Sequence, residues 1–146
     1  MGYFQVWNSF NSVNVLNTAL TSIDVHSLAF VAGHIGVYFN SALTSLSLPA
    51  LTYVGLYVFI YYNNALTACS MPALTYVAWY FKVNSNSNLA AFAAPALVKI
   101  ANKGLNTWTV NLCSNAASLS YSAAISHAAA LNACWLPPCS TLATCK

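Results

Sequence analysis

The stretch SALTSLSLPALTYVGLYVFIYYN at residues 41–63 decides the fold, because its pattern recurs along the chain. Residues 64–86 read NALTACSMPALTYVAWYFKVNSN, and residues 87–109 read SNLAAFAAPALVKIANKGLNTWT. A fourth copy, TALTSIDVHSLAFVAGHIGVYFN, precedes them at residues 18–40. Each copy spans 23 residues (63 − 40 = 23), and the repeat is clearest from Thr18 to Ile100. A fixed period of this length predicts a solenoid in which each copy forms one coil.

Apolar residues occupy equivalent places in the copies, which predicts inward-facing columns of a stacked core. Leu46 and Leu48 alternate with polar residues as in a strand. In the second half of the copy, Val58 and Ile60 should point to one side, and Phe59 and Tyr61 to the other. Each coil should therefore hold at least two strands, separated by a corner at Pro49 or its equivalents. The predicted core columns are Leu20/Leu43/Leu66/Leu89, Ile23/Leu46/Cys69/Phe92, Val25/Leu48/Met71/Ala94, Leu28/Leu51/Leu74/Leu97 and Val31/Val54/Val77/Ile100.

Asparagine closes the copies, at Asn40, Asn63 and Asn86. Asparagine accepts the left-handed backbone conformation that many turns require, so we expect these three residues to adopt it. Their side chains can also hydrogen-bond to one another along the solenoid. A structural role in turns is therefore favoured over a role in ligand binding.

The repeated pattern N-x-A-L-T-x-L-x-x-P-A-L-T-x-V resembles the receptor L-domain type of leucine-rich repeat, found in cell-surface proteins that include repetitive bacterial extracellular ones. The best match is NSALTSLSLPALT at residues 40–52, and the resemblance covers about Thr18 to Ile100. It implies a right-handed β-helical stack, secretion and a recognition or surface role. The chain departs from the family at Gly55-Leu-Tyr and Ala78-Trp-Tyr, where members usually carry glycine and polar residues, and again beyond Ile100.

The chain is unusually poor in charge. Hydrophobic residues make up 59% and charged residues 3%, the only acid is Asp24, and neither Glu nor Arg occurs. The fixed cations are Lys82, Lys99, Lys103 and Lys146, too few and too scattered to predict nucleic-acid binding. A surface with so little charge tends to associate, so copies of the chain, a surface layer or lipid should cover it. No run of about 18 apolar residues predicts a transmembrane helix.

We expect a single all-β domain over residues 1–146, a leucine-rich-repeat-like solenoid with both ends capped. Residues 1–17 form the predicted N-terminal cap coil, residues 18–109 the repeats, and residues 110–146 the C-terminal cap. Within the C-terminal cap, residues 116–133 have the spacing of a short helix.

Four of the five cysteines lie in the predicted C-terminal cap, at Cys113, Cys134, Cys139 and Cys145. This placement predicts a disulfide-stapled cap in an oxidising compartment, and hence an extracellular or cell-surface protein. Three connectivities remain open. A zinc site that includes His127 is an alternative, but the C-x4-C-x5-C spacing suits structural zinc poorly, so no metal is predicted. Cys69, in a core column, is expected to be a buried free thiol.

No catalytic constellation is visible, which predicts a protein that is not an enzyme and has no cofactor. Acid–base chemistry needs a positioned carboxylate, His or Lys, and this chain has one Asp and three His. Asp24 and His26 lie two residues apart near Ser22 and Ser27, but no nucleophile motif frames either serine. An exposed surface pair is the favoured interpretation.

The outward positions carry the functional hypothesis, because stacked coils turn sequence columns into ladders about 4.8 Å apart. The ladders His34/Tyr57/Tyr80, Tyr38/Tyr61, Phe39/Tyr62, Phe30/Tyr53/Tyr76 and Leu56/Trp79 should form a broad aromatic wall. The candidate assembly residues are Tyr38, Tyr53, Tyr57, Phe59, Tyr61, Tyr62, Tyr76, Trp79 and Tyr80.

Exposed aromatic area of this kind predicts a structural protein whose copies pack into a filament or surface layer. One alternative is a module that binds carbohydrate or another surface ligand through the wall. A further alternative is an ice-binding solenoid that uses the ladders Thr21/Thr44/Thr67 and Thr52/Thr75.

Overall fold

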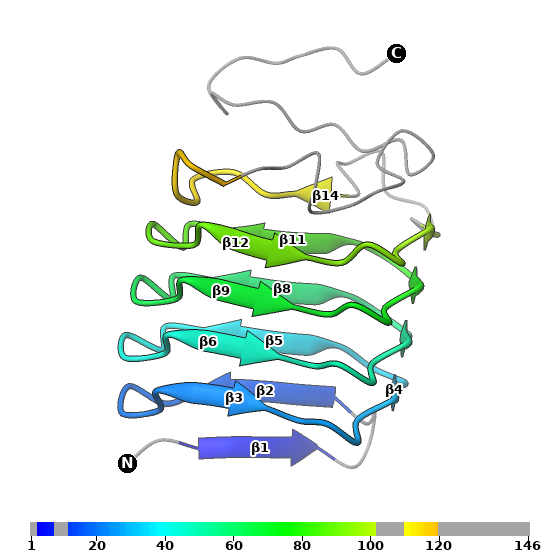
Figure 1. The fold of residues 1–146 in the computed structure, drawn as a ribbon. Helices are drawn as coiled ribbons and strands as arrows, with labels where there is room; N and C mark the ends of the chain where they lie inside the picture. The colour runs from blue at the N-terminus through cyan, green and yellow to red at the C-terminus, as the bar shows by residue number, and fades with distance from the viewer. Residues whose placement is uncertain (1–2, 8–11, 102–109, 120–146) are drawn as a thin grey trace.

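The structure is a computed structural model that describes residues 3–7, 12–101 and 110–119, with the backbone alone for residues 3–7 and Val110. These residues form a parallel β-solenoid of about four coils, and they include no helix. The coils lie one above another with β1 (Tyr3–Trp7) at one end of the stack (Figure 1). The predicted all-β solenoid is confirmed.

Three sheets run along the solenoid. Sheet A consists, in spatial order, of β1 (Tyr3–Trp7), β2 (Ser12–Leu16), β5 (Ile35–Tyr38), β8 (Val58–Tyr61), β11 (Phe81–Asn84) and β14 (Val110–Asn111). Sheet B consists of β3 (Ser22–Asp24), β6 (Ser45–Ser47), β9 (Ala68–Ser70) and β12 (Ala91–Ala93). Sheet C consists of β4 (Phe30–Val31), β7 (Tyr53–Val54), β10 (Tyr76–Val77) and β13 (Lys99–Ile100).

Each coil contributes one strand to every sheet, so it holds three strands where the sequence indicated at least two. Neighbouring strands are parallel and pair residues of equivalent columns, such as Leu46 with Cys69. The corner after sheet B falls at Pro49 and its equivalents, as predicted. The strands of sheet C, such as Tyr53–Val54, were missed because two residues are too short to show a period.

The core lies between the sheets and follows the predicted columns. Leu51, Leu74 and Leu97 are fully buried, as are Leu43, Leu66 and Leu89. The members of the first coil are less well covered, and Leu20, Val25 and Leu28 are only partly buried. Each coil therefore buries its apolar residues against the coils on either side.

Asparagine side chains form a buried ladder parallel to the axis. The Asn40 amide donates to Oδ1 of Asn63 at 2.9 Å, and the Asn63 amide donates to Oδ1 of Asn86 at 3.1 Å. Asn115 extends the series, because its Oδ1 accepts from the Asn86 amide at 3.2 Å. Each amide also donates to backbone carbonyls, as Asn63 does to Val37 at 3.0 Å. The predicted hydrogen bonding along the solenoid is confirmed.

The predicted left-handed conformation of these asparagines is wrong. The residue before each asparagine adopts it instead: φ is 57° at Phe39, 54° at Tyr62 and 57° at Ser85. The left-handed residue thus comes one position before the asparagine, whose buried side chain joins the ladder. A left-handed backbone at an aromatic residue is uncommon.

The ends of the chain depart from the 23-residue period. Within the predicted N-terminal cap coil, β1 pairs antiparallel with β2, and β2 already belongs to the parallel stack on β5. Beyond Ile100, β14 pairs with β11 after 29 residues (110 − 81 = 29), six more than the repeat. Residues 116–119 form a turn, and the remainder of the predicted capping helix lies outside the described residues.

Two of the five cysteines, Cys69 and Cys113, lie in the described part of the chain. Cys69 is a buried free thiol, as predicted, and burial raises its pKa well above the usual range of a thiol. Cys113 lies within the described part of the chain, whereas Cys134, Cys139 and Cys145 lie outside it. The disulfide-stapled cap therefore stays a prediction.

The asparagine ladder should make a large contribution to stability. Asn63→Ala removes an amide that donates to the carbonyls of Val37 and Tyr61 and to Asn86, which leaves buried polar groups without partners. We expect the free energy of unfolding to fall by more than about 2 kcal/mol, measured by urea denaturation. The adjacent Asn64 is exposed, and Asn64→Ala is the matched control. Equal losses in the two variants would contradict a special role for the ladder.

Gly55 should be intolerant of a side chain. A Cβ added there would overlap the backbone carbonyl oxygen of Ala32 in the coil below. We expect Gly55→Ala to destabilise the protein by about 1–3 kcal/mol, as overpacking does elsewhere, measured as a lower thermal midpoint. The equivalent residue of the next coil, Ala78, already carries a Cβ, and Ala78→Gly should cost only about 0.5–1 kcal/mol. A smaller loss for Gly55→Ala than for Ala78→Gly would refute this account.

Candidate functional site

The main candidate site is a cluster of rings along the outer side of sheet A. In β8, Val58 and Ile60 point into the core and are fully buried, so Phe59 and Tyr61 point outward by strand alternation. We define the aromatic face as His34, Tyr38, Phe39, Tyr57, Phe59, Tyr61, Tyr62 and Tyr80.

Equivalent rings of successive coils stack on one another. The ring centroids of His34 and Tyr57 lie 4.6 Å apart, and those of Tyr57 and Tyr80 lie 5.0 Å apart. The pair Tyr38/Tyr61 is stacked at 5.3 Å. The pair Phe39/Tyr62 is stacked at 5.2 Å. Parallel strands hold these side chains at stacking distance, so the predicted ladders form as the 23-residue period requires.

Phe59 joins the ladders into one surface. Its ring lies 5.6 Å from Tyr57, 5.4 Å from Tyr80 and 5.3 Å from Tyr61 in edge-on or tilted contacts. Tyr61 in turn contacts Tyr62, with 5.5 Å between the ring centroids. The aromatic face is therefore continuous across sheet A.

One lysine covers part of this surface. The ammonium of Lys82 lies 4.8 Å from the ring centroid of Tyr80 and 5.3 Å from that of Phe59. These distances fit cation–π contacts. Lys82 follows Phe59 in its column (82 − 59 = 23), so the period could have revealed this contact.

The rings of the predicted wall make contacts in two groups, one on sheet A and the other on sheet C. On sheet C the ring of Tyr53 stacks between those of Phe30 and Tyr76, with centroids 4.7 Å and 4.9 Å away. The ammonium of Lys99 lies 5.8 Å from the ring centroid of Tyr76. Trp79 lies in the bend between β10 and β11 and is 36% exposed. Of the nine candidate residues, six belong to the aromatic face: Tyr38, Tyr57, Phe59, Tyr61, Tyr62 and Tyr80.

His34, at one end of the aromatic face, has polar partners that the sequence did not indicate. Its Nε2 lies 3.1 Å from Oδ1 of Asn14, and its backbone N–H donates to Oγ of Ser12 at 3.1 Å. Asn14 lies opposite Gly36, where an added Cβ would come within 2.5 Å of the Asn14 Oδ1. Asn14 was missed because this first pairing spans 22 residues (36 − 14 = 22) and falls outside the repeat.

Three phenols of the aromatic face, those of Tyr57, Tyr61 and Tyr80, are held neutral near pH 7. Desolvation by burial raises the pKa of Tyr57, Tyr61 and Tyr80, and neighbouring tyrosines raise the pKa of each further. At neutral pH the face therefore presents ring edges and hydroxyl groups that can both donate and accept hydrogen bonds.

The Asp24 and His26 side chains form the surface pair that the sequence indicated. Asp24 Oδ1 lies 3.4 Å from His26 Nδ1, and both side chains are more than half exposed, so water screens their attraction. No group of three or more potential metal ligands occurs within residues 12–101 and 110–119. None of the elements in the described ranges is a helix long and apolar enough to cross a membrane.

No protein-family model matches this chain, and neither does any curated protein or solved structure.

His34 should make stability depend on pH. Burial lowers the pKa of His34 below its ordinary value of 6.5, so the unfolded chain binds a proton more readily than the folded one. The contribution of His34 to the free energy of unfolding should therefore be constant above pH 6.5. It should fall as the pH drops through 6.5 toward the folded-state pKa. We expect His34→Gln to reduce this dependence, measured by urea denaturation between about pH 5 and pH 8. An NMR titration midpoint for His34 above 6.5 in the folded protein would contradict the predicted loss of stability at low pH.

Proposed function

We propose that this chain is a non-enzymatic, extracellular structural protein that assembles with copies of itself into a filament or surface layer through the aromatic face. The observation that carries the proposal is the continuity of that face. Phe39 and Tyr62 are each 51% exposed, and a continuous series of ring contacts connects them to Tyr80. Contiguous exposed apolar area usually marks an interface, and tyrosine is common in the residues that dominate interface energies.

The low charge of the chain favours an aromatic face that is covered by another copy rather than exposed to water. Among the described side chains, Lys82 is the only fixed charge in contact with rings of the aromatic face. Packing a second copy against this face would therefore require little desolvation of charge, which is otherwise a large cost. A formal net charge of +3 spread over 146 residues gives only weak long-range repulsion between copies.

The arrangement of the rings favours self-assembly over glycan binding. Sugars pack on the open faces of aromatic rings, but Tyr57 has His34 on one side and Tyr80 on the other. Its two ring faces are thus occupied by neighbours, and the ring edge is what remains for a partner. Edges and hydroxyls suit interdigitation with an identical aromatic surface.

Ice binding through the threonine ladders is less well supported than self-assembly or glycan binding. The hydroxyls of Thr44 and Thr67 donate to the carbonyls of Thr21 and Thr44 at 2.9 and 3.1 Å. Thr75 similarly donates to Thr52 at 3.0 Å. These hydroxyl protons are already used within the solenoid, so they are not free to order water.

The finer sequence expectations form part of the same proposal. They are the right-handed coil and kinship with the receptor L-domain type of leucine-rich repeat, both implied by the resemblance at residues 40–52. They also include disulfides among Cys113, Cys134, Cys139 and Cys145. An oxidising extracellular compartment would be consistent with all of them.

Lateral assembly should depend on the centre of the aromatic face. Tyr61 has ring contacts with Tyr38, Phe39, Phe59 and Tyr62, so Tyr61→Lys would place a charge where apolar area must be buried. We expect the unaltered protein to form elongated particles in negative-stain microscopy at physiological salt, and Tyr61→Lys to abolish them.

Thr44→Lys is the control, because it adds the same charge at an exposed position beside sheet B. It should leave the particles intact. A single monomer peak for the unaltered protein in light scattering at physiological salt would reject the proposal.

A further inference from the structure

The N-terminal end of the solenoid is shaped like a step. Sheet A has six strands and begins with β1, whereas sheets B and C have four strands each and begin with β3 and β4. Since β1 pairs with β2, sheet A extends one strand beyond the other two sheets at this end (Figure 1). The end thus combines a protruding strand on one side with a recess beneath β3 on the other.

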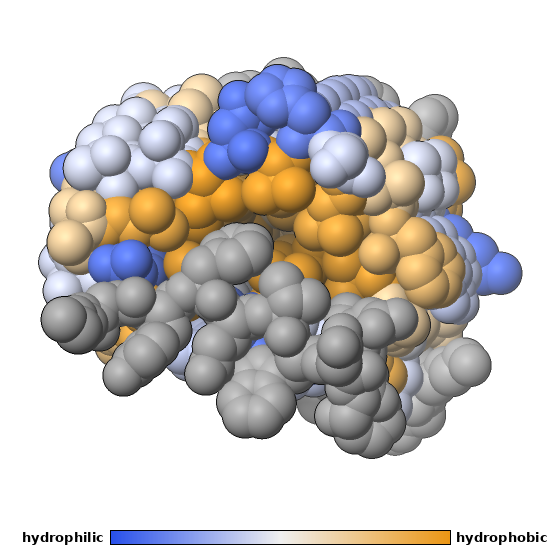
Figure 2. Space-filling model, turned by 90° about the horizontal axis from the view of Figure 1, so that it is seen from below, coloured by the Kyte–Doolittle hydropathy of each residue, from blue (hydrophilic) through white to orange (hydrophobic). Residues whose placement is uncertain are grey.

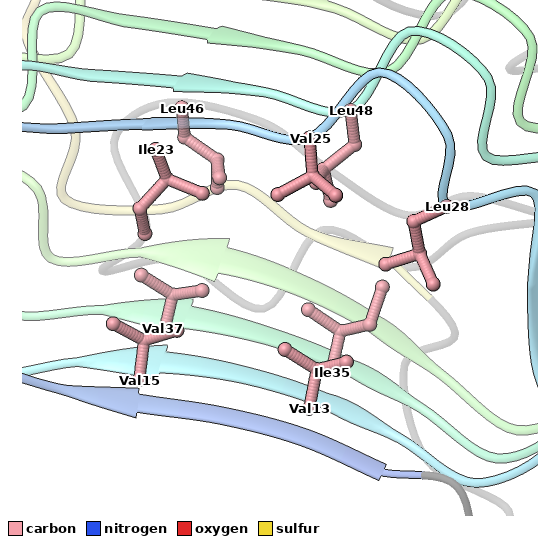
Figure 3. Close-up of a pocket in the computed structure, with 9 residues that line it drawn as sticks. All are labelled: Val13, Val15, Ile23, Val25, Leu28, Ile35, Val37, Leu46 and Leu48. Carbon is pink, nitrogen blue, oxygen red and sulfur yellow. The ribbon is translucent and has the colours of Figure 1, made fainter. Parts of the chain in front are cut away.

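The recess is apolar. A shallow pocket there is lined entirely by aliphatic side chains, with Val13 and Val15 from sheet A facing Ile23, Val25 and Leu28 (Figure 3). Seen from this end, apolar side chains are visible in the hollow between the sheets (Figure 2). The side chains lining this pocket offer no polar atoms to a ligand.

The apolar residues of the first coil are less well covered than their equivalents in later coils. Leu28 is only partly buried, whereas its equivalents Leu51, Leu74 and Leu97 are fully buried. Val25 is likewise partly buried, whereas Met71 and Ala94 in its column are fully buried. Among the described strands, sheets B and C end at β3 and β4, so no further strand of either sheet lies beneath this coil.

Strand edges are open at the same place. β3 pairs only with β6 and β4 pairs only with β7, so each leaves one edge unpaired among the described strands. β1 has one unpaired edge in the same sense, because β2 is its only partner. Unpaired edges above an apolar recess favour the addition of a strand.

We propose that two copies of this chain join at their N-terminal ends around a two-fold axis that runs along the strands. Such an axis exchanges the sheet A side of one copy with the sheet B side of the other and preserves strand direction. β1 and β3 run in the same direction (Figure 1), so β1 of each copy lies parallel to β3 of the other. The protruding strand of each copy fills the recess of its partner.

Self-complementarity is what identifies a second copy as the partner. Both halves of the contact occur on the same end of one chain, as a two-fold interface requires. The added strand continues the ladder of sheet B by one step, so the contact repeats the strand pairing that already joins β3 to β6. This interface is separate from the aromatic face and does not depend on it.

The test uses the full chain with Tyr61→Lys, which removes lateral association and leaves the N-terminal end unchanged. We expect this variant to sediment as a dimer. Adding Leu28→Lys places a charge in the recess and should yield monomers. Adding Ala29→Lys instead is the matched control, because Ala29 is the adjacent, exposed residue, and the dimer should remain.

Hydrogen exchange provides a second measurement that needs no substitution in the recess. In the Tyr61→Lys variant, exchange in the β3 segment should slow as protein concentration rises, while exchange in β12 should not change. A Tyr61→Lys monomer whose β3 exchange is independent of concentration would overturn this interface, and so would a dimer that survives Leu28→Lys in a folded protein. If the unaltered protein stops at the dimer, the lateral proposal fails and this interface stands.

Discussion

The buried asparagine ladder is the interaction on which the other features depend. An amide side chain in a dry core is costly unless all its polar atoms are paired, and here each pairs with the next asparagine and with backbone carbonyls. The pairing is possible only if successive coils bring an asparagine to the same place. The ladder therefore fixes where each coil must close, and from Asn40 to Asn86 the apolar and aromatic columns follow the same 23-residue spacing.

The same regularity connects the fold to the proposed function. Because strands in successive coils are parallel and in register, any residue type kept at an outward position forms a stack. Tyrosine and phenylalanine at outward positions of β5 and β8 thus give a continuous surface without a pocket or a loop. A surface of this kind is suited to broad contact with another protein surface.

The period in the sequence predicted the solenoid, its core columns and the aromatic ladders, since all of these depend on spacing alone. It could not place Asn14 beside His34, because the first pairing is one residue shorter than the repeat. It also did not distinguish the rings on sheet A from those on sheet C. Tyr53 and Tyr57 are four residues apart, but the bend at Gly55 places them on different sides of the solenoid. Direction changes of this kind depend on backbone angles, which spacing does not reveal.

Because the asparagine ladder repeats once per coil, the chain could gain or lose whole coils during evolution. Each internal coil contacts only its two neighbours, and the contacts of one internal coil are nearly the same as those of the next. Duplication of a single 23-residue segment would add a coil of about 4.8 Å and lengthen the aromatic face by one row. Deletion of one segment would shorten the face by the same amount. The length of the solenoid is therefore set by the number of 23-residue repeats.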